Sequence, residues 1–177
     1  LATTLGGLLR SMVERARASL REQRLSVGDR VALLAPNSAR WVAADLAMLA
    51  EGLTVVPLYA RQAPSELAFM VRDAGAKLVV ADGDALAQGL RDAGVEVPMM
   101  ELATLFDREA PQRQPARALP ADHTATIIYT SGSSGEPKGV RTTLGNADGM
   151  MPVLDAKLRE LTGRSGGEDR VFHYLPL

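Results

Sequence analysis

Four short, mostly apolar runs, separated by segments with helical periodicity, are the feature that most constrains the fold of this chain. The runs cover residues 31–35, 53–57, 77–81 and 95–99, and their composition is typical of buried parallel strands. Amphipathic or capped segments lie before and between the runs and predict helices at 8–24, 38–52, 64–75 and 84–92. Parallel neighbours need a crossover, which is nearly always right-handed. The alternation therefore predicts an α/β fold, a parallel sheet with flanking helices built from βαβ units.

The polar residues of the first helix and the methionines in this region suggest no binding site. Arg10, Glu14, Arg17 and Arg21 share one helix face, and mixed charges of this kind predict a solvated face. Four methionines are expected to fill gaps in the core rather than to line a ligand pocket. They are Met48, Met70, Met99 and Met100.

A composition change divides the chain. Residues 107–121 carry three prolines interleaved with arginines and have no periodicity, which predicts a linker or surface crossing between two lobes. We expect a βαβ-rich lobe over 1–106 and an incomplete second lobe over 122–177. In that second lobe the pattern predicts strands at 124–130, 139–142 and 171–177, with a helix at 146–161 and a polar loop at 163–169. His123, just before the first of these strands, is expected at the surface.

The overall composition excludes several function classes. The 177 residues contain no cysteine, which rules out disulfide scaffolds, cysteine-based zinc sites and cysteine nucleophiles. Lys plus Arg is 20 and Asp plus Glu is 21, so the net charge of −1 predicts no partner among nucleic acids or anionic membranes. No apolar run approaches the length of a membrane span, and no signal peptide is visible. These features predict a cytoplasmic protein without a transmembrane segment.

The segment that carries chemistry is Tyr-Thr-Ser-Gly-Ser-Ser-Gly-Glu-Pro-Lys-Gly at residues 129–139. Glycines at 132, 135 and 139 allow positive φ and close backbone approach to a ligand, and successive free N–H groups form an anion site. Hydroxyl groups come from Thr130, Ser131, Ser133 and Ser134. Lys138 adds a positive charge behind the stiff Pro137. We interpret the segment as a polyphosphate cradle and call residues 129–139 the phosphate loop.

Two familiar nucleotide motifs do not fit this loop. A Walker A loop needs Gly-Lys-Ser/Thr five residues after its first glycine, but from Gly132 that position holds Pro137, and Gly139 follows Lys138. The dinucleotide fingerprint Gly-x-Gly-x-x-Gly occurs nowhere after an expected strand. The alternative is a flexible Gly/Ser hairpin loop. Two features argue against it: the β-branched strand before the loop and the stiff Pro-Lys-Gly sequence after it.

The loop closely resembles the phosphate-binding loop of the adenylate-forming superfamily, which includes acyl-CoA synthetases, luciferases and peptide-synthetase adenylation domains. Every fixed position of that pattern is met, and Glu136 occupies its free position, where we expect the side chain to point to solvent. Residues 28–38, 50–58 and 174–177 look like other segments of the family. The resemblance implies the N-terminal part of a larger enzyme's large domain.

The resemblance also implies an activity and a set of roles. Family members activate a carboxylic acid with MgATP as acyl-adenylate and pass the acyl group to a thiol, often coenzyme A. Backbone from Ser131 through Gly132, Ser133, Ser134 and Gly135 is then expected to hold the β- and γ-phosphates. Hydroxyls of Thr130 and Ser131 would bind phosphate or Mg²⁺, with Thr130 the metal candidate. Lys138 is the expected catalytic residue, neutralising charge on pyrophosphate, and His173 is a candidate at the substrate site.

Several questions stay open at this point. The chain begins at Leu1 and ends on an apolar run at Leu177, so we expect a fragment that lacks the rest of its enzyme and does not catalyse adenylation alone. The ending Phe-His-Tyr-Leu-Pro-Leu favours a fatty-acid–CoA ligase-like parent. A peptide-synthetase or aryl-acid adenylation domain is the first alternative. A non-catalytic nucleotide- or phosphate-binding module is the second.

Overall fold

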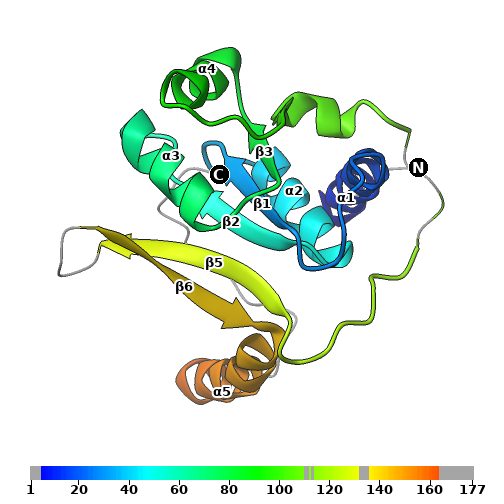
Figure 1. The fold of residues 1–177 in the computed structure, drawn as a ribbon. Helices are drawn as coiled ribbons and strands as arrows, with labels where there is room; N and C mark the ends of the chain where they lie inside the picture. The colour runs from blue at the N-terminus through cyan, green and yellow to red at the C-terminus, as the bar shows by residue number, and fades with distance from the viewer. Residues whose placement is uncertain (1–4, 110–111, 113, 132–135, 164–177) are drawn as a thin grey trace.

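The computed structural model describes residues 5–109, 112, 114–131 and 136–163, and its helices and strands alternate along the chain (Figure 1). The elements of the first part are α1 (Leu5–Arg21), β1 (Arg30–Leu34), α2 (Ala39–Ala50), β2 (Thr54–Leu58), α3 (Pro64–Asp73), β3 (Leu78–Ala81), α4 (Asp84–Asp92), β4 (Met99–Glu101) and the 3₁₀ helix η1 (Leu102–Phe106). The second part contains β5 (Thr124–Ser131), β6 (Pro137–Thr143) and α5 (Leu144–Thr162).

The described strands form one six-stranded sheet in the order β4-β3-β1-β2-β5-β6. Every neighbouring pair is parallel except β5 and β6, which form an antiparallel hairpin. The α/β fold with a mostly parallel sheet and flanking helices, expected from the sequence, is therefore confirmed. Strands β5 and β6, which follow the expected linker, belong to the same sheet as β1–β4. The expected division of the chain into two lobes stays a prediction.

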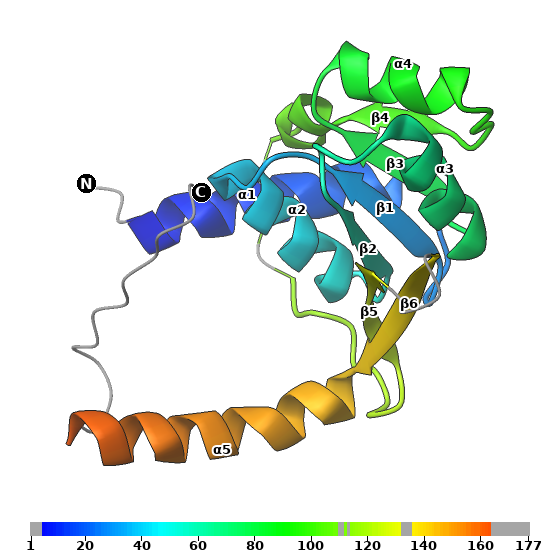
Figure 2. The same cartoon turned by 90° about the vertical axis from the view of Figure 1, so that its left-hand side faces the viewer.

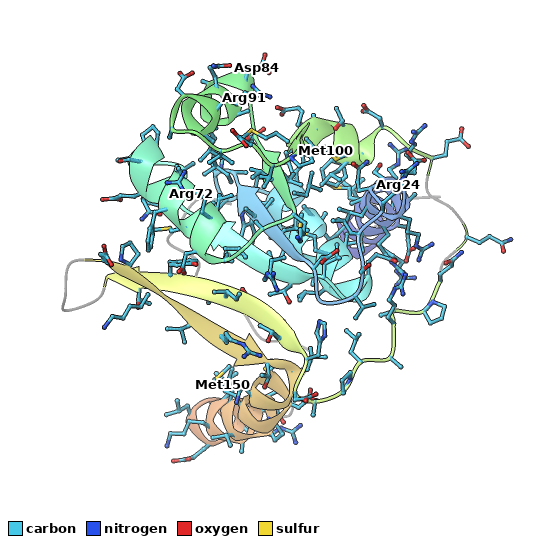
Figure 3. All side chains as sticks on the ribbon, viewed as in Figure 1. Arg24, Arg72, Asp84, Arg91, Met100 and Met150 are labelled. Atoms are coloured by element: carbon cyan, nitrogen blue, oxygen red, sulfur yellow. The ribbon has the colours of Figure 1, made fainter. Side chains whose placement is uncertain are left out.

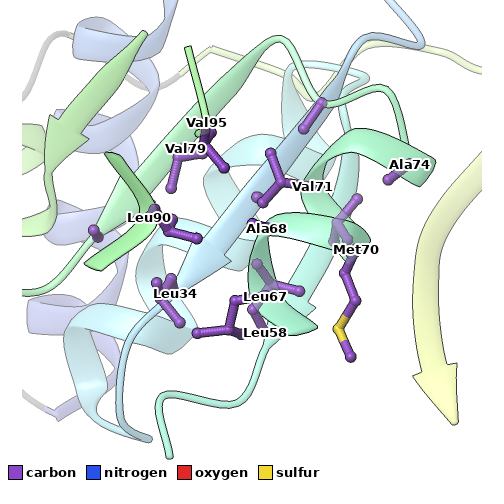
Figure 4. Close-up of a cluster of buried hydrophobic side chains, with 14 of the residues drawn as sticks. Leu34, Leu58, Leu67, Ala68, Met70, Val71, Ala74, Val79, Leu90 and Val95 are labelled. Atoms are coloured by element: carbon purple, nitrogen blue, oxygen red, sulfur yellow. The ribbon is translucent and has the colours of Figure 1, made fainter. Parts of the chain in front are cut away.

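Two apolar clusters cover the two faces of the sheet. Alternate residues of β1 belong to different clusters: Ala32 and Leu34 face α3 and α4 (Figure 4), and Val31 and Leu33 face α1, α2 and η1. This explains why the central strands are apolar throughout rather than alternating. Two of the four methionines, Met48 and Met70, are buried in the core as expected, and Met70 also lines an apolar cavity described below.

The other two methionines mark the place where strand prediction was off by a few residues. We expected a strand at 95–99, but β4 begins at Met99. Met99 packs against the cluster that faces α3 and α4, and Met100, labelled in Figure 3, packs against the opposite cluster. Val95 is buried in the core before the strand begins. The following 3₁₀ helix was not predicted, and it buries Leu102 and Leu105 three residues apart on one side.

The helix boundaries follow from local chemistry. The Oγ of Ser38 accepts a hydrogen bond from the N–H of Trp41 at 3.1 Å, which makes Ser38 the N-cap of α2. Gly52 and Gly75, at the turns after α2 and α3, have φ of 76° and 61°. That left-handed backbone favours glycine, as the sequence indicated.

One expectation about α1 was wrong. Arg17 is only 2% exposed and Glu14 is also buried, so this part of the polar face does not point to solvent. Arg17 Nε donates to Glu51 Oε1 at 2.8 Å, and its Nη1 contacts both carboxylate oxygens of Glu14 at 3.2 Å. The face is polar because it contains a buried cluster of charges between α1 and α2.

The proline- and arginine-rich segment between η1 and β5 completes this cluster. The guanidinium of Arg17 donates to the backbone oxygens of Gln114 and Pro115 at 2.6 and 2.9 Å, and Arg117 Nε lies 3.6 Å from Glu51 Oε2. The described part of 107–121 contains no helix or strand, yet these contacts fix it against α1 and the end of α2.

Helix α5 stands apart from the rest of the molecule (Figures 1 and 2). Thr143 and Asn146 form a capping box at its start, two residues earlier than the sequence predicted. Its apolar side chains include Met150, labelled in Figure 3, and Leu154, and both are exposed. The expected loop from 164 onward and the expected strand at 171–177 lie outside the described residues. Within the described chain, no helix has the length and apolar character needed to cross a membrane.

Candidate functional site

The β5–β6 hairpin brings the two ends of the phosphate loop together. Thr130 pairs with Lys138 and Ser131 pairs with Pro137 in the antiparallel register. Directly opposed residues project to the same face, so the Thr130 hydroxyl and the Lys138 ammonium lie on one side of the hairpin. Two residues expected to contact phosphate, eight positions apart in sequence, are therefore neighbours in the fold.

That face of the hairpin is the exposed one. Ile127 and Tyr129 pack toward α3 and its apolar cluster, so the alternate residues of β5 face the other way. Thr130 and Lys138 are both exposed there. Glu136 is exposed as well, as expected. The cradle residues Gly132, Ser133, Ser134 and Gly135 lie outside the described residues, as does His173, so their expected roles stay predictions.

Tyr129 ties the hairpin to the helical layer. Its phenolic O–H donates to Oδ2 of Asp73, the last residue of α3, at 2.5 Å. Burial raises the pKa of the Tyr129 phenol, and the hydrogen bond and charge of Asp73 raise it further. The phenol therefore stays neutral and remains a donor at physiological pH.

Gly139 has a different role from the one expected. It is not among the described glycines with positive φ, so an unusual backbone conformation is not the reason for a glycine at this position. A Cβ at this position would lie 2.9 Å from Cγ2 of Ile127 and 3.2 Å from Cζ of Tyr129. The absence of a side chain lets Tyr129 lie across β6, and Gly139 thereby shapes the exit of the phosphate loop through packing.

His123 differs from the surface histidine that we expected. Its side chain is partly buried, and Nε2 is buried without a hydrogen-bond partner among the described residues. It lines a polar cavity of about 580 Å³ that also contains Arg30 and Arg141. No local sequence signal identifies this position, because the cavity walls come from segments far apart in the chain.

Sequence reasoning also missed an apolar cavity of about 630 Å³ close to the phosphate loop. It lies at the carboxyl ends of β1 and β2, beside β5. Its walls come from four elements and from the loops after β1 and β2, so no single motif marks it. They include Trp41, Leu58, Tyr59, Met70 and Ile128.

The part of the chain that the structure describes holds no group of three or more His, Asp or Glu side chains arranged to bind a metal ion. Thr130 is the one expected metal ligand that can be placed, and its hydroxyl lies on the same face as Lys138. The expected Mg²⁺ site therefore stays a prediction.

Comparison with known proteins agrees with this geometry. The model of the AMP-binding enzyme family matches residues 7–177. The chain belongs to this AMP-binding family. The match includes the whole phosphate loop and all six described strands of the sheet, so the resemblance inferred from the loop is confirmed.

The names of the curated relatives give more than one kind of activity. The long-chain-fatty-acid–CoA ligase FadD15 of Mycobacterium bovis is 30% identical over 170 residues, which is 86% of this chain and 28% of that protein. The probable non-canonical nonribosomal peptide synthetase CymA of Salinispora arenicola is 30% identical over 146 residues, 82% of this chain and 2% of that protein. The chain therefore spans only a small part of the length of these AMP-binding relatives.

Solved structures in the AMP-binding family have the same fold. O-succinylbenzoate coenzyme A synthetase (MenE) from Bacillus subtilis, in complex with AMP, aligns with a TM-score of 0.72 at 26% identity. The alignment covers 85% of this chain and 38% of that one. The sheet and helices described above are thus an arrangement found in members of this family.

Proposed function

We propose that these residues form the N-terminal part of an ATP-dependent acid–thiol ligase of the fatty-acid–CoA ligase type. The enzyme activates a carboxylic acid as acyl-AMP and transfers the acyl group to a thiol, with coenzyme A as acceptor. The observation that carries the proposal is the Thr130–Lys138 pair on the exposed face of the hairpin, at the mouth of the phosphate loop. Similarity to FadD15 supports the fatty-acid–CoA ligase type.

In this proposal the chain's own groups position and neutralise phosphate charge. Lys138 places its ammonium beside the β- and γ-phosphates, and Thr130 offers a hydroxyl to a phosphate oxygen or to Mg²⁺. Backbone N–H groups from Ser131 to Gly135 supply the rest of the cradle. Such pre-arranged charges lower a barrier because they need no reorganisation when negative charge develops on the leaving group.

Other parts of the reaction belong to residues beyond this chain. The relatives are several times longer, and we propose that the isolated 177 residues do not form acyl-AMP. His173 is proposed at the acid site on the basis of the family resemblance alone. The cytoplasmic location also stays a prediction.

A peptide-synthetase adenylation domain is the second candidate, and the similarity to CymA favours it. The two candidates share the adenylation step and differ in the acid and in the thiol acceptor. A coenzyme A ligase releases its acyl group on the small thiol, whereas a synthetase loads a carrier-protein thiol. The choice of acid therefore distinguishes them.

Carboxylate-dependent ATP–pyrophosphate exchange by the complete reading-frame product tests the proposal. Fatty, aryl and amino acids are assayed in parallel, and we expect exchange with fatty acids. Lys138→Ala should lower the exchange rate about 100-fold or more, the loss typical of removing one transition-state charge contact. Lys77→Ala removes an exposed lysine just before β3 and should leave the rate unchanged.

Each other outcome has a definite meaning. Exchange only with amino acids would replace the first candidate by the second. Absence of exchange with any acid by a folded protein that still binds ATP would show a non-catalytic nucleotide-binding module. A Lys138→Ala rate equal to the wild-type rate would reject the role given to the hairpin face.

A further inference from the structure

The polar cavity of about 580 Å³ opens at the amino edge of the sheet. Strands β1, β2 and β5 are neighbours in the sheet and run parallel, so their first residues lie at one edge. Those residues are Arg30, Thr54 and Thr124, and all three line the cavity. We call it the amino-edge cavity. Ligands of open α/β sheets usually bind at the other edge, at the carboxyl ends of the strands, so the fold alone does not predict a site here.

The amino-edge cavity lies on the face of the hairpin that is turned away from Lys138. Helix α3 lies beside the hairpin, and Ile127 and Tyr129 pack toward it (Figure 1). Directly opposed residues share a face, so their register partners Arg141 and Gly139 face the same way. All four residues line the cavity, whereas Lys138 does not. The cavity is therefore separate from the exposed face that is proposed to hold the phosphates of ATP.

Two guanidinium groups line the amino-edge cavity, and neither forms an ion pair with the described residues. Nε and Nη2 of Arg141 donate to Oγ1 of Thr124 at 3.1 and 2.6 Å. The same two atoms of Arg30 donate to the backbone oxygen of Gly75, both at 3.4 Å. These partners are uncharged, so neither positive charge has a paired negative group in the part of the chain that the structure describes.

The other titratable groups of the cavity do not cancel this charge. Asp73 is the one carboxylate among the described lining residues, and its Oδ2 already accepts the hydrogen bond from Tyr129. Two arginines against one aspartate leave the lining net positive. Nε2 of His123 is buried without a hydrogen-bond partner among the described residues, although such groups in folded proteins usually have one. The cavity is thus polar, positive and incompletely satisfied by the residues around it.

A phosphate group has the chemistry that such a cavity would bind. Guanidinium groups form forked, charge-assisted hydrogen bonds with phosphate oxygens. Near pH 7 a phosphate monoester carries about −1.5 to −2 charges, so it offsets both arginines more fully than one carboxylate does. The cavity volume lies within the usual range of small-molecule sites. That room exceeds what free phosphate needs and fits a phosphate attached to a small polar body.

We propose that the amino-edge cavity binds the phosphate group of a small polar molecule, with the guanidinium groups of Arg30 and Arg141 as its partners. The site is independent of the proposed ligase activity, because Thr130, Ser131 and Lys138, the described residues expected to contact ATP, do not line it. Its chemistry also differs. The phosphate loop is expected to bind through backbone N–H groups and one lysine, whereas the cavity offers two guanidinium groups.

Isothermal titration calorimetry of the complete reading-frame product, in a buffer without phosphate, tests the site. Ribose 5-phosphate is the probe, because it joins a phosphate monoester to a small polar body. We expect saturable binding, with ribose at least about tenfold weaker because it lacks the charged group. Inorganic phosphate in a third titration separates the two sources of this chemistry. Weaker binding than ribose 5-phosphate identifies an ester as the ligand, and equal or tighter binding identifies free phosphate.

Variants of the two arginines locate the binding. Arg141→Gln should weaken ribose 5-phosphate binding about tenfold or more, the loss expected for a charge-assisted hydrogen bond. Arg141→Lys retains the charge but not the fork and should lose less than Arg141→Gln. Arg30→Gln should also weaken binding about tenfold. Arg40→Gln changes an exposed arginine of α2 outside the cavity and should change the affinity less than about twofold. Circular dichroism confirms that each variant is folded.

Lys138→Ala separates the cavity from the phosphate loop, because Lys138 and Arg141 lie on opposite faces of β6. Lys138→Ala should lower ATP binding, measured by equilibrium dialysis, and leave the affinity for ribose 5-phosphate within about twofold of the wild-type value. Arg141→Gln should do the reverse. The expected pattern for ribose 5-phosphate without any ATP binding would support the cavity and count against the phosphate loop.

Other results would overturn the cavity and leave the ligase proposal standing. They are ATP binding without saturable binding of ribose 5-phosphate or phosphate, equal affinities for ribose and ribose 5-phosphate, and a wild-type affinity of Arg141→Gln for ribose 5-phosphate. Loss of ribose 5-phosphate binding in Lys138→Ala but not in Arg141→Gln would place the probe at the phosphate loop and overturn the cavity as well.

Discussion

The phenolic oxygen of Tyr129 lies 2.5 Å from Oδ2 of Asp73 and joins the strand that enters the phosphate loop to the end of α3. This contact matters because β5 has only one register pair with β2. The hairpin is therefore positioned as much by a side-chain hydrogen bond and packing as by the sheet ladder. The same contact places Thr130, the next residue, on the opposite, exposed face.

Removing that hydroxyl should loosen the hairpin. We expect Tyr129→Phe to lower the free energy of unfolding by about 1 kcal/mol, the usual net value of one hydrogen bond. Urea denaturation measures this change. Tyr59→Phe is the control, because Tyr59 is 62% exposed and its hydroxyl has no hydrogen bond with the described residues. Equal losses in both variants would contradict the anchoring role of Tyr129.

The packing role of Gly139 gives a second prediction. Gly139→Ala introduces a Cβ 2.9 Å from Ile127 Cγ2, so the hairpin must shift, at a cost of about 1–3 kcal/mol. Gly149→Ala, in α5, meets open space and should stabilise the fold by up to about 1 kcal/mol through helix propensity. Thermal unfolding should therefore show melting temperatures that move in opposite directions. A shift of the same sign would reject the steric argument.

The buried charge cluster gives a third prediction. Burial raises the pKa of the Glu51 carboxyl, but hydrogen bonds from Arg21 and Arg17 outweigh burial and lower it overall. Glu51→Gln leaves the buried guanidinium of Arg17 with less compensation, and we expect a loss of about 3 kcal/mol in urea denaturation.

The surface pair of Glu22 and Arg108 is the matched control for the cluster. Its nitrogen–oxygen distance is 2.7 Å, and both side chains are more than half exposed. Glu22→Gln should cost less than about 1 kcal/mol because solvent screens the pair. If both variants lost the same stability, the Glu51 cluster would be energetically equivalent to a surface pair.

Asp45 predicts how stability depends on pH. Burial raises the pKa of its carboxyl to about 6, and the described residues give it no hydrogen bond or ion pair. The unfolded pKa is about 3.9, so the folded state is penalised as pH rises through the interval from about 4 to 6. Asp45→Asn should therefore stabilise the fold by about 2 kcal/mol at pH 7 and have little effect near pH 4. Urea denaturation at the two pH values measures the difference, and an equal gain at both would show that ionisation is not the cause.

The sequence predicts the elements best where packing and local chemistry agree. Helix α4 has the predicted boundaries, Asp84–Asp92, because its periodicity and flanking glycines mark both ends. The start of β4 was misplaced because Val95, although apolar, is buried in the core before the strand and does not belong to the sheet. The burial of Arg17 could not be predicted, since two of its partner segments, at Glu51 and at 114–115, are distant in sequence and its helix face looks solvated.

In the site, too, the features set by local sequence were predicted and the features set by distant contacts were not. The motif identified the phosphate loop, and the strands on either side of it were expected, but the pairing of Thr130 with Lys138 comes from the structure. The sequence could not show that β2 and β5 share the single register pair Val55 and Thr126, because this depends on how segments 71 residues apart meet in the sheet. The orphaned Nε2 of His123 likewise depends on walls supplied by remote parts of the chain.

The contacts of Arg17 also set an order of events during synthesis. Its two backbone acceptors, at Gln114 and Pro115, come 97 and 98 residues later in the chain. A nascent chain that has formed α1 and α2 still has an incompletely satisfied guanidinium, and non-local closures of this length are slow. The packing of α1 against α2 therefore reaches its full stability only after the segment around Pro115 has left the ribosome and folded back onto α1.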